Sequence, residues 1–332
     1  MIRVCLVGCG SIAIAAHGPA LKRLQSEGLA ELTACCDVSR VRAEEFSERF
    51  AFHMAYTDFD AMMETERPDA VFMLLPVRIN LQFTLRALER GIPAIMEKPP
   101  GADAREARMI ETAADEKGIY HAVLFNRRSM PLVTLLQEQL DGERVEAVTL
   151  EMCRFARTDA DFTTTAIHGI DCLRGLFGDF KTLKMDYQKN SLGATNYYMH
   201  GSMGNDVRVD MRFLPCAGSV TERIAVYTAG KQFYLNLPVW SGTTYVPGSD
   251  DPGSLTVFHQ EEKIFSVDGT QRSGTSEGFV LNGFYDEDKR VLMEISTRKS
   301  TSFPASRFLE SVELSALLRE RKALYEKKES SL

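Results

Sequence analysis

The sequence has no hydrophobic run long enough to cross a membrane. Its longest apolar run, residues 70–77, is far shorter than the ~20 residues that a transmembrane helix needs, and its N-terminus shows no signal-peptide pattern. Basic residues are not gathered into a stripe either, and the formal net charge is −7. Because nucleic-acid binding depends on clustered positive charge, we expect neither nucleic-acid nor membrane partners.

The seven cysteines lack the spacings of a disulfide framework or a zinc site. Their number is odd, none forms a C-x-x-C pair, and most of them lie within apolar runs. Such cysteines are typical of buried, reduced thiols. The sequence therefore predicts no metal site and a cytoplasmic location.

The composition is that of an ordinary globular protein, with 44% hydrophobic and 26% charged residues over 332 positions. A single core rarely grows beyond about 250–300 residues, so two domains are expected. In residues 1–125, short apolar runs alternate with amphipathic stretches, as a doubly wound α/β domain with a parallel sheet requires. The predicted strands are 3–7, 32–36, 70–75, 93–96 and 120–124, and the predicted helices are 12–26, 40–50, 79–90 and 103–117.

From residue 126 onward, strand-like segments follow one another with few helices between them. This pattern predicts a second domain, residues 126–332, of the α+β class with a mainly antiparallel sheet. The predicted strands are 145–154, 181–187, 207–213, 219–228, 231–237 and 255–267, with helices at 131–140 and 165–177. Two amphipathic helices are expected to close the chain, and the highly charged residues 319–332 are expected to end it as a solvated helical tail.

A glycine motif, GCGSIA at residues 8–13, follows the first predicted strand and precedes the first predicted helix. It matches the G-x-G-x-x-A form of the Rossmann fingerprint, whose glycines allow a tight turn and a close approach of backbone to a pyrophosphate. Asp37 ends the second predicted strand, at the place of the acid that binds the ribose of NAD and repels the 2′-phosphate of NADP. The first domain is therefore predicted to be a Rossmann domain that binds NAD. NADP is less favoured, although Arg40 and Arg42 lie nearby.

A second motif, Glu97-Lys98-Pro99, follows the fourth predicted strand of the first domain, residues 93–96. Cofactors and substrates bind at the carboxyl ends of strands in such sheets, which places Lys98 beside the nicotinamide. A positive neighbour and partial desolvation would lower the pKa of a lysine there, so that Lys98 could accept a proton near neutral pH.

Several segments together resemble the Gfo/Idh/MocA family, named after glucose-fructose oxidoreductase, inositol dehydrogenase and a rhizopine-catabolism protein. They are GCGSIA, Asp37, EKP at 97–99, FNRR at 125–128 and AIHGID at 166–171, and residues 279–315 also resemble the family's closing segment. The resemblance implies a Rossmann domain followed by an open-faced sheet that often serves for oligomerisation. It further implies NAD(P)-dependent redox chemistry on sugar or cyclitol alcohols, in a homo-oligomer (dimer or tetramer).

The same resemblance implies that Lys98 and His168 are the catalytic residues. Asp171 lies one helical turn after His168 and would either orient it or pair locally. The predicted cofactor contacts are Gly8, Gly10, Ser11, Ile12, Asp37, Pro76, Glu97 and Lys98, and the predicted substrate contacts are Asn126, Arg127, Thr164 and Asp171. Arg154 and Arg157 could bind an anionic substrate group, although a solvated pair of side chains is the favoured interpretation.

Two positions depart from the family pattern. Sugar dehydrogenases of the family commonly have an acid where this chain has Thr164 and a histidine where it has Asn80. Threonine can hydrogen-bond a hydroxyl but is no base at neutral pH. The main hypothesis is therefore a dehydrogenase that acts on a secondary alcohol of a sugar-like substrate. A catalytically weak NAD-binding regulatory protein and an NAD-assisted glycoside hydrolase are the alternatives.

Overall fold

The computed structural model describes residues 1–158, 161–244, 246, 248 and 250–327. The chain forms two compact units. Unit 1 comprises Met1–Asn126 and Gly283–Leu309, and unit 2 comprises Arg127–Asn282 and Glu310–Leu332. The sequence predicted a second domain that ran without interruption from residue 126 to 332, whereas residues 283–309 pack with unit 1. We call this stretch the return segment.

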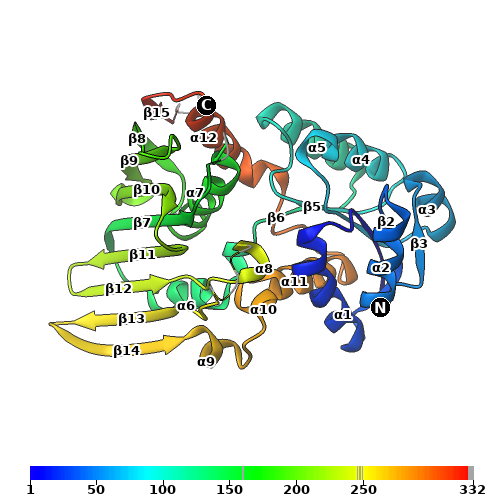
Figure 1. Ribbon diagram of the computed structural model, residues 1–332, viewed down its shortest axis with the longest axis horizontal. Helices are drawn as coiled ribbons and strands as arrows, with labels where there is room; N and C mark the ends of the chain where they lie inside the picture. Colours follow the sequence, from blue (N-terminus) through cyan, green and yellow to red (C-terminus); the bar gives the residue numbers. More distant parts are fainter. Residues whose placement is uncertain (159–160, 245, 247, 249, 328–332) are drawn as a thin grey trace. The chain divides into compact units, whose positions relative to one another are not determined.

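Unit 1 is built on a six-stranded parallel sheet in the order β3-β2-β1-β4-β5-β6 (Figure 1). The strand order reverses between β1 and β4, which is the Rossmann topology and confirms the predicted doubly wound class. Its strands are β1 (Ile2–Val7), β2 (Ala30–Cys36), β3 (Met54–Tyr56), β4 (Ala70–Met73), β5 (Ala94–Glu97) and β6 (His121–Leu124). Its helices before the return segment are α1 (Gly18–Ser26), α2 (Arg40–Phe50), α3 (Phe59–Glu66), α4 (Val77–Glu89) and α5 (Ala104–Lys117).

The predicted helix over 12–26 starts with a wider turn than expected. Residues Ala13–His17 form a π-helical turn (η1), closed by a hydrogen bond from the Gly18 N–H to the Ala13 carbonyl, and α1 follows. Pro19 explains the change, because proline has no N–H to donate and its ring clashes with the carbonyl four residues earlier. The π turn ends at His17, whose side chain is fully buried.

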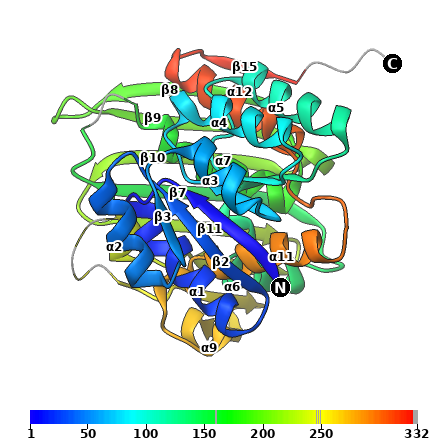
Figure 2. The ribbon, with the colours of Figure 1, turned by 90° about the vertical axis from the view of Figure 1, so that its right-hand side faces the viewer.

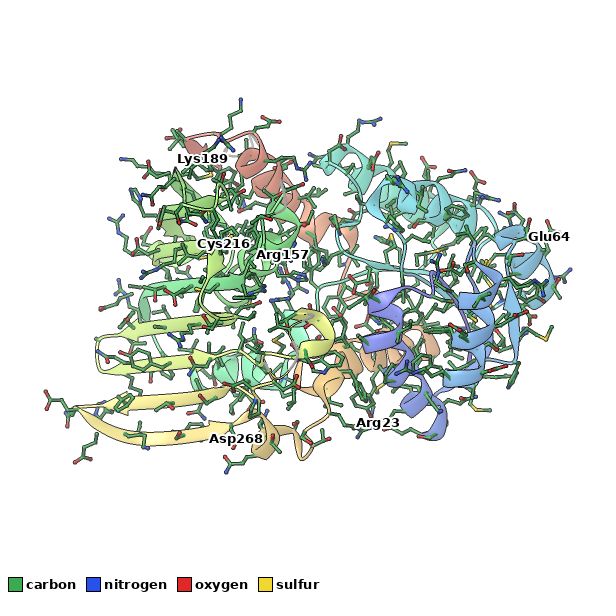
Figure 3. The ribbon with its side chains drawn as sticks, viewed as in Figure 1. Arg23, Glu64, Arg157, Lys189, Cys216 and Asp268 are labelled. Atoms are coloured by element: carbon green, nitrogen blue, oxygen red, sulfur yellow. The ribbon has the colours of Figure 1, made fainter. Side chains whose placement is uncertain are left out.

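The return segment consists of α11 (Phe284–Ser296) and a short 3-10 turn, η4 (Ala305–Phe308). Within unit 1, α11 lies beside α1 on one side of the sheet, and α4 and α5 lie on the other side (Figures 1 and 2). Tyr285 of α11 donates its hydroxyl to Glu27 at 2.6 Å, and the guanidinium of Arg23, labelled in Figure 3, lies 4.4 Å from the centre of the Tyr285 ring. The return segment is thus a structural part of unit 1.

Unit 2 contains a nine-stranded sheet in the order β14-β13-β12-β11-β7-β10-β9-β8-β15. Only the pair β7–β10 is parallel among these neighbours, which confirms the predicted mainly antiparallel sheet. The strands are β7 (Val145–Phe155), β8 (Phe180–Lys189), β9 (Thr195–Met203), β10 (Arg208–Ala217), β11 (Thr221–Thr228), β12 (Lys231–Asn236), β13 (Ser254–His259), β14 (Glu262–Asp268) and β15 (Leu324–Glu326). The helices and short helical turns are η2 (Asn126–Ser129), α6 (Pro131–Gln139), α7 (Thr163–Phe177), η3 (Gly204–Asp206), α8 (Ser241–Thr244), α9 (Gly269–Ser273), α10 (Gly278–Leu281) and α12 (Leu309–Arg319).

Burial alternates along the central strands of this sheet, as in the pattern of β10, where Val209, Met211 and Phe213 are buried and the residues between them are exposed. The buried face packs against α6 and α7 and forms the core of unit 2. The predicted helical tail is wrong as far as residue 327, because Leu324–Glu326 pair with β8 as an edge strand. No helix among the described residues is both long and apolar enough to span a membrane.

Candidate functional site

The glycine turn after β1 has the geometry of a phosphate-binding loop. Gly8 has φ of 97°, and a Cβ there would lie 2.3 Å from the Leu74 carbonyl oxygen, so only glycine fits. A Cβ at Gly10 would instead meet no neighbouring atom within 4 Å. Gly10 and Ser11 are exposed, and Ile12 is half-buried. The turn therefore leaves space where a pyrophosphate would approach the backbone, at the N–H groups that open a helix.

Asp37, directly after β2, is tied to this turn. Its Oδ2 accepts the Cys9 N–H at 3.0 Å, and its Oδ1 accepts the Ser39 N–H at 2.9 Å and two bonds from Arg42 at 3.1 and 2.7 Å. Burial alone would raise the pKa of Asp37, but these hydrogen bonds lower it. The carboxylate is thus ionised at neutral pH and fixed beside the glycine turn. These residues fit a dinucleotide: Gly10 and Ser11 would hold its phosphates and Asp37 its ribose.

Pro76 lies directly before the neighbouring helix α4, and Asn80 lies in its first turn. Pro76 is the exposed residue that precedes the first turn of α4. Asn80 is buried, donates from Nδ2 to the Pro100 carbonyl at 3.5 Å, and accepts from the Thr84 hydroxyl at 3.4 Å. Asn80 therefore supports the segment after Lys98.

The EKP motif lies where β5 ends, as the sequence predicted, and its glutamate has a partner that the sequence did not indicate. The Lys98 N–H donates to Glu97 Oε2 at 3.1 Å, and Glu97 Oε1 lies 3.1 Å from Nε2 of the buried His17. The other ring nitrogen of His17 lies 3.0 Å from both carboxylate oxygens of Asp288 on α11. Burial alone would lower the pKa of His17, but the charge of Asp288 and the hydrogen bonds to the two acids raise it to about 10.

A third acid, Glu287, lies next to this group. Its Oε1 accepts the Phe125 N–H at 2.6 Å, directly after β6. Burial raises the pKa of Glu287 well above its usual value, and the neighbouring Glu97 and Asp288 raise it further. Burial also raises the pKa of Asp288. Unit 1 thus holds one imidazolium among three carboxyl groups, and the pKa of Glu287 lies well above its usual value.

The residues after β6 begin the charged interior of unit 2. Asn126 is buried at the end of unit 1, whereas Arg127 in unit 2 binds Glu222 with two hydrogen bonds at 2.8 and 2.5 Å. Arg154 also donates to Glu222 and is only 8% exposed, so the favoured interpretation of Arg154 as a solvated side chain is wrong. Burial would raise the pKa of Glu222, but the two guanidinium groups lower it to about 2.

Arg157, the other member of that predicted pair, lies beside Cys216 (Figure 3). The Cys216 thiol donates to the Arg157 carbonyl at 3.4 Å, and the guanidinium lies 5.9 Å from the centre of the Phe162 ring. Its side chain therefore also makes contacts within unit 2.

Helix α7 carries the predicted substrate-side residues. Thr164 is exposed and donates to the Asp161 carbonyl at 3.3 Å, and His168, half-buried, lies one turn later on the same face. Asp171 is 1% exposed and accepts two bonds from Arg128 at 2.7 and 2.8 Å and one from Ser311 at 2.9 Å. Asp171 thus pairs with Arg128 and Ser311, which are 43 and 140 residues away in sequence, and it also lies 3.9 Å from Arg174 one helical turn later, which is the local pairing considered for it.

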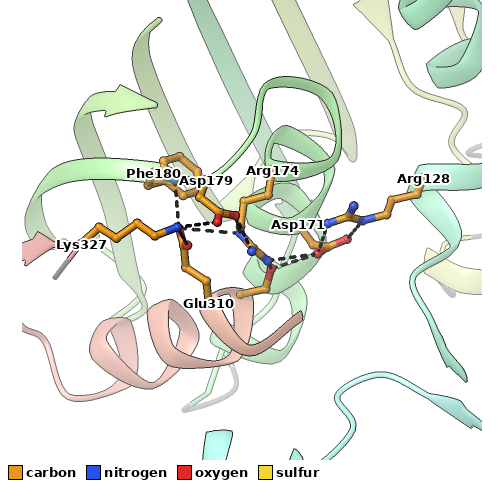
Figure 4. A network of polar contacts seen from close by, with 8 residues as sticks. Arg128, Asp171, Arg174, Asp179, Phe180, Glu310 and Lys327 are labelled. Atoms are coloured by element: carbon orange, nitrogen blue, oxygen red, sulfur yellow. Dashed lines mark hydrogen bonds and ion pairs between the residues drawn. The ribbon is translucent and has the colours of Figure 1, made fainter. Parts of the chain in front are cut away.

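Asp171 belongs to a network that Figure 4 shows in full. Arg174 bonds both Ser311 and Asp179, and Lys327 bonds Asp179 and Glu310 at 2.5 and 3.2 Å. Glu310 also accepts the N–H of Phe180 at 2.9 Å. This network joins α7, the start of β8, α12 and the end of the described chain. It serves the packing of unit 2.

Comparisons with known proteins show what this chain is similar to. Residues 2–125 match the model of the oxidoreductase family Gfo/Idh/MocA, with an NAD-binding Rossmann fold. A dTDP-3,4-didehydro-2,6-dideoxy-alpha-D-glucose 3-reductase from Actinomadura kijaniata is 34% identical over 118 residues, covering 36% of this chain and 34% of that protein. D-glucoside 3-dehydrogenase from Escherichia coli is 30% identical over 139 residues, covering 42% and 39%. The chain thus spans less than two thirds of the length of these relatives.

Among solved structures, an oxidoreductase from Agrobacterium radiobacter in complex with NAD+, L-tartaric acid and magnesium has the same fold. The TM-score is 0.82 at 15% identity, with 98% of each chain covered. At this identity the likeness concerns the fold alone.

Proposed function

Because residues 2–125 of this chain match the model of the Gfo/Idh/MocA oxidoreductase family, we propose that it is a nicotinamide-dependent dehydrogenase acting on a sugar, cyclitol or related polyol. The observation that carries the proposal is the arrangement in unit 1 of the open glycine turn, the ionised Asp37 and Lys98 at the carboxyl end of β5. The names of the two relatives above, a glucoside 3-dehydrogenase and a hexose 3-reductase, support a sugar-like substrate and chemistry at a secondary alcohol.

The cofactor would supply the hydride chemistry, so the chain must bind it, orient the substrate and move one proton. We propose that Lys98 and His168 share the proton transfer at the reacting hydroxyl. Asn126 and Thr164 are proposed contacts to other hydroxyls. Arg127 binds Glu222, and Asp171 binds Arg128. We therefore propose that Arg127 and Asp171 stabilise unit 2 instead of contacting substrate.

We propose NAD as the preferred cofactor because the Asp37 carboxylate repels a 2′-phosphate, while Arg42 is engaged by Asp37 and Arg40 by Glu44. A ligand present at 100 times its Kd stabilises a protein by about 2.7 kcal/mol, which a thermal shift detects. We expect NAD+ to raise the Tm more than NADP+, and Asp37→Ala, which frees Arg42, to reverse the order. Glu44→Gln, which frees the exposed Arg40, is the matched control. A larger shift with NADP+ in the unaltered protein would refute the NAD preference.

The reaction itself is tested by incubating the protein with NAD+ and a panel of sugars, cyclitols and other polyols while nicotinamide absorbance is followed. We expect reduction with at least one of them and its loss in Lys98→Ala. Lys22→Ala, an exposed lysine of unit 1 whose amine donates to the Arg49 carbonyl, is the control. Tight NAD+ binding without turnover would instead indicate the regulatory protein. Release of an aglycone without net NADH would indicate the glycoside hydrolase.

We also propose a homo-oligomer formed through the face of the nine-stranded sheet that lies opposite its core. This face has a groove of about 600 Å³ lined by residues of five strands. Glu151 lies there 3.5 Å from Arg212 and 3.9 Å from Arg223, so charges of both signs are available for pairing with a second copy. We expect a dimer or tetramer by light scattering, and a smaller species for the Arg212→Glu/Arg223→Glu variant. Six of the seven cysteines are buried as thiols, which supports the proposed cytoplasmic location.

A further inference from the structure

A chain of charged contacts crosses the interior of unit 1 and ends at the EKP motif. It runs from Asp288 on α11 through the ring of His17 to Glu97 at the end of β5. Glu97 is 80 residues and Asp288 is 271 residues from His17 in the sequence, so the fold brings the three side chains together. Nothing in the proposed reaction requires this contact by itself.

The His17 ring is held in one orientation. With a pKa of about 10 the ring is an imidazolium at neutral pH, so both nitrogens donate, and each faces a carboxylate. The Phe284 ring meets the imidazole edge-on, with centroids 5.3 Å apart, and the Phe72 ring lies 6.1 Å away. His17 and Asp288 are fully buried, while the Glu97 side chain keeps 12% exposure.

The Glu97 carboxylate connects this buried pair to the backbone of Lys98. One of its oxygens accepts from His17 and the other accepts the Lys98 N–H, each at 3.1 Å. The carboxylate cannot turn without breaking one of the two bonds. The position of the Lys98 backbone therefore depends on the imidazolium behind it.

We propose that His17, clamped between Asp288 and Glu97, is a positioning residue for Lys98. It acts through the Glu97 carboxylate and does not contact the reacting atoms. The inference rests on the proposed function, because Lys98 needs a fixed position only if it takes part in chemistry.

A role in stability alone does not explain why His17, Asp288 and Glu97 are charged residues. Taking an ion pair out of water is costly, and well-packed apolar side chains of similar volume commonly serve stability as well or better. Besides the three carboxyl groups, the apolar rings of Phe72 and Phe284 lie against the His17 ring. A charged group at this place is expected where orientation matters more than stability.

The test compares two substitutions that each keep one half of the histidine. In His17→Asn the amide nitrogen replaces Nδ1, so the bond to Asp288 remains and the bond to Glu97 is lost. In His17→Gln the amide nitrogen replaces Nε2, so the bond to Glu97 remains. His121→Gln is the control, because His121 is also buried in unit 1 but accepts the Ala305 N–H and contacts neither Glu97 nor Lys98.

The first readout is the rate at which the Lys98 amine is acetylated by acetic anhydride, relative to Lys22 in the same sample, measured by mass spectrometry. We expect the ratio to change several-fold in His17→Asn, to return towards the original value in His17→Gln, and to stay unchanged in His121→Gln. With an active substrate, kcat should fall roughly 10- to 100-fold in His17→Asn, since displacing a reacting group by about 1 Å costs up to about 10²-fold, while KM for the cofactor changes little.

An unchanged Lys98 ratio in His17→Asn, an equal change in His121→Gln, or no recovery in His17→Gln would each overturn the proposal. If His17→Asn does not fold, Glu97→Gln gives the same test at a partly exposed position, with the same expected change and the same refuting result. The acetylation readout needs neither substrate nor turnover. A protein that oxidises no polyol therefore refutes the proposed function and leaves the test of His17 intact.

Discussion

The two units bury charge in different ways. Unit 1 surrounds the single imidazolium of His17 with three carboxyl groups, whereas unit 2 places guanidinium groups directly against carboxylates, as Arg127 and Arg154 do at Glu222. A guanidinium keeps its proton at every pH a protein meets, but an imidazolium and a buried carboxylic acid do not. The difference indicates that alkali weakens unit 1 and acid weakens unit 2.

The signs follow from the direction of each pKa shift. The folded pKa of His17, about 10, is above its ordinary value of 6.5, so its stabilising contribution is complete below 6.5 and is lost as the pH rises through about 10. The folded pKa of Glu222, about 2, is below its ordinary 4.5, so its contribution is complete above 4.5 and is lost as the pH falls through about 2.

The largest effect is expected at Glu222. Glu222→Gln removes the carboxylate that Arg127 and Arg154 share and leaves two largely buried cations against a neutral amide. Breaking a buried pair in this way costs about 3–5 kcal/mol. Urea unfolding at neutral pH, followed through the fluorescence of Trp240, the single tryptophan and a residue of unit 2, measures this loss. Glu262→Gln at an exposed position is the control, and a loss of less than about 1 kcal/mol at Glu222 would remove the basis of the comparison.

A smaller effect of opposite sign is expected at Glu287. The pKa of this acid is raised well above 4.5 in the folded protein, so folding takes up a proton just above that pH. The free energy of unfolding therefore falls by up to about 1.4 kcal/mol per pH unit as the pH rises above 4.5. Glu287→Gln carries no such proton. We expect this variant to gain stability over the unaltered protein between about pH 5 and pH 6, measured by urea unfolding followed by circular dichroism. Parallel pH curves for the two proteins would contradict a raised pKa of Glu287, and Glu116→Gln, an exposed acid on α5, is the control.

The smallest effect on stability is expected at Tyr285, which binds the acid Glu27 near the surface of unit 1. The Tyr285 hydroxyl donates to both oxygens of Glu27, at 2.6 and 2.7 Å, and lowers the pKa of that acid. Tyr285→Phe removes the hydroxyl and keeps the ring, so we expect a loss of about 1 kcal/mol. A thermal unfolding curve resolves such a change. A loss as large as that at Glu222 would mean that unit 1 relies on surface charge as strongly as unit 2 relies on buried charge.

Much of the fold could be predicted from the sequence because local patterns specify it. Five apolar runs predicted five of the six strands of unit 1, and the predicted helix 40–50 coincides with α2. The strand β3 was missed because it has only three residues, Met54–Tyr56, too few to give an apolar run as long as those of the other strands. The hairpin between β13 and β14 was predicted as one strand, since Gln260 and Glu261 occupy its positive-φ positions, where glycine or asparagine usually gives the signal.

The candidate site was predictable only where short motifs determine it. The glycine turn, Asp37 and Lys98 lie at strand ends of unit 1 as predicted. The bonds from Asp171 to Arg128 and Ser311 could not be predicted, because these partners are 43 and 140 residues away in sequence. His17 gave no signal either, since a histidine in an amphipathic helix pattern is recognised as functional only once Asp288 is seen against it.

The return segment also has a consequence for the order in which the molecule folds. During synthesis the first 126 residues leave the ribosome long before Glu287 and Asp288 have been made. Until then His17 cannot pair with Asp288, and the Phe125 N–H cannot bond to Glu287. Contacts of such long sequence separation form late and slow the folding of a domain. Unit 1, although it begins at the N-terminus, is completed only when residues 283–309 have been made, by which time most of unit 2 is already available to fold.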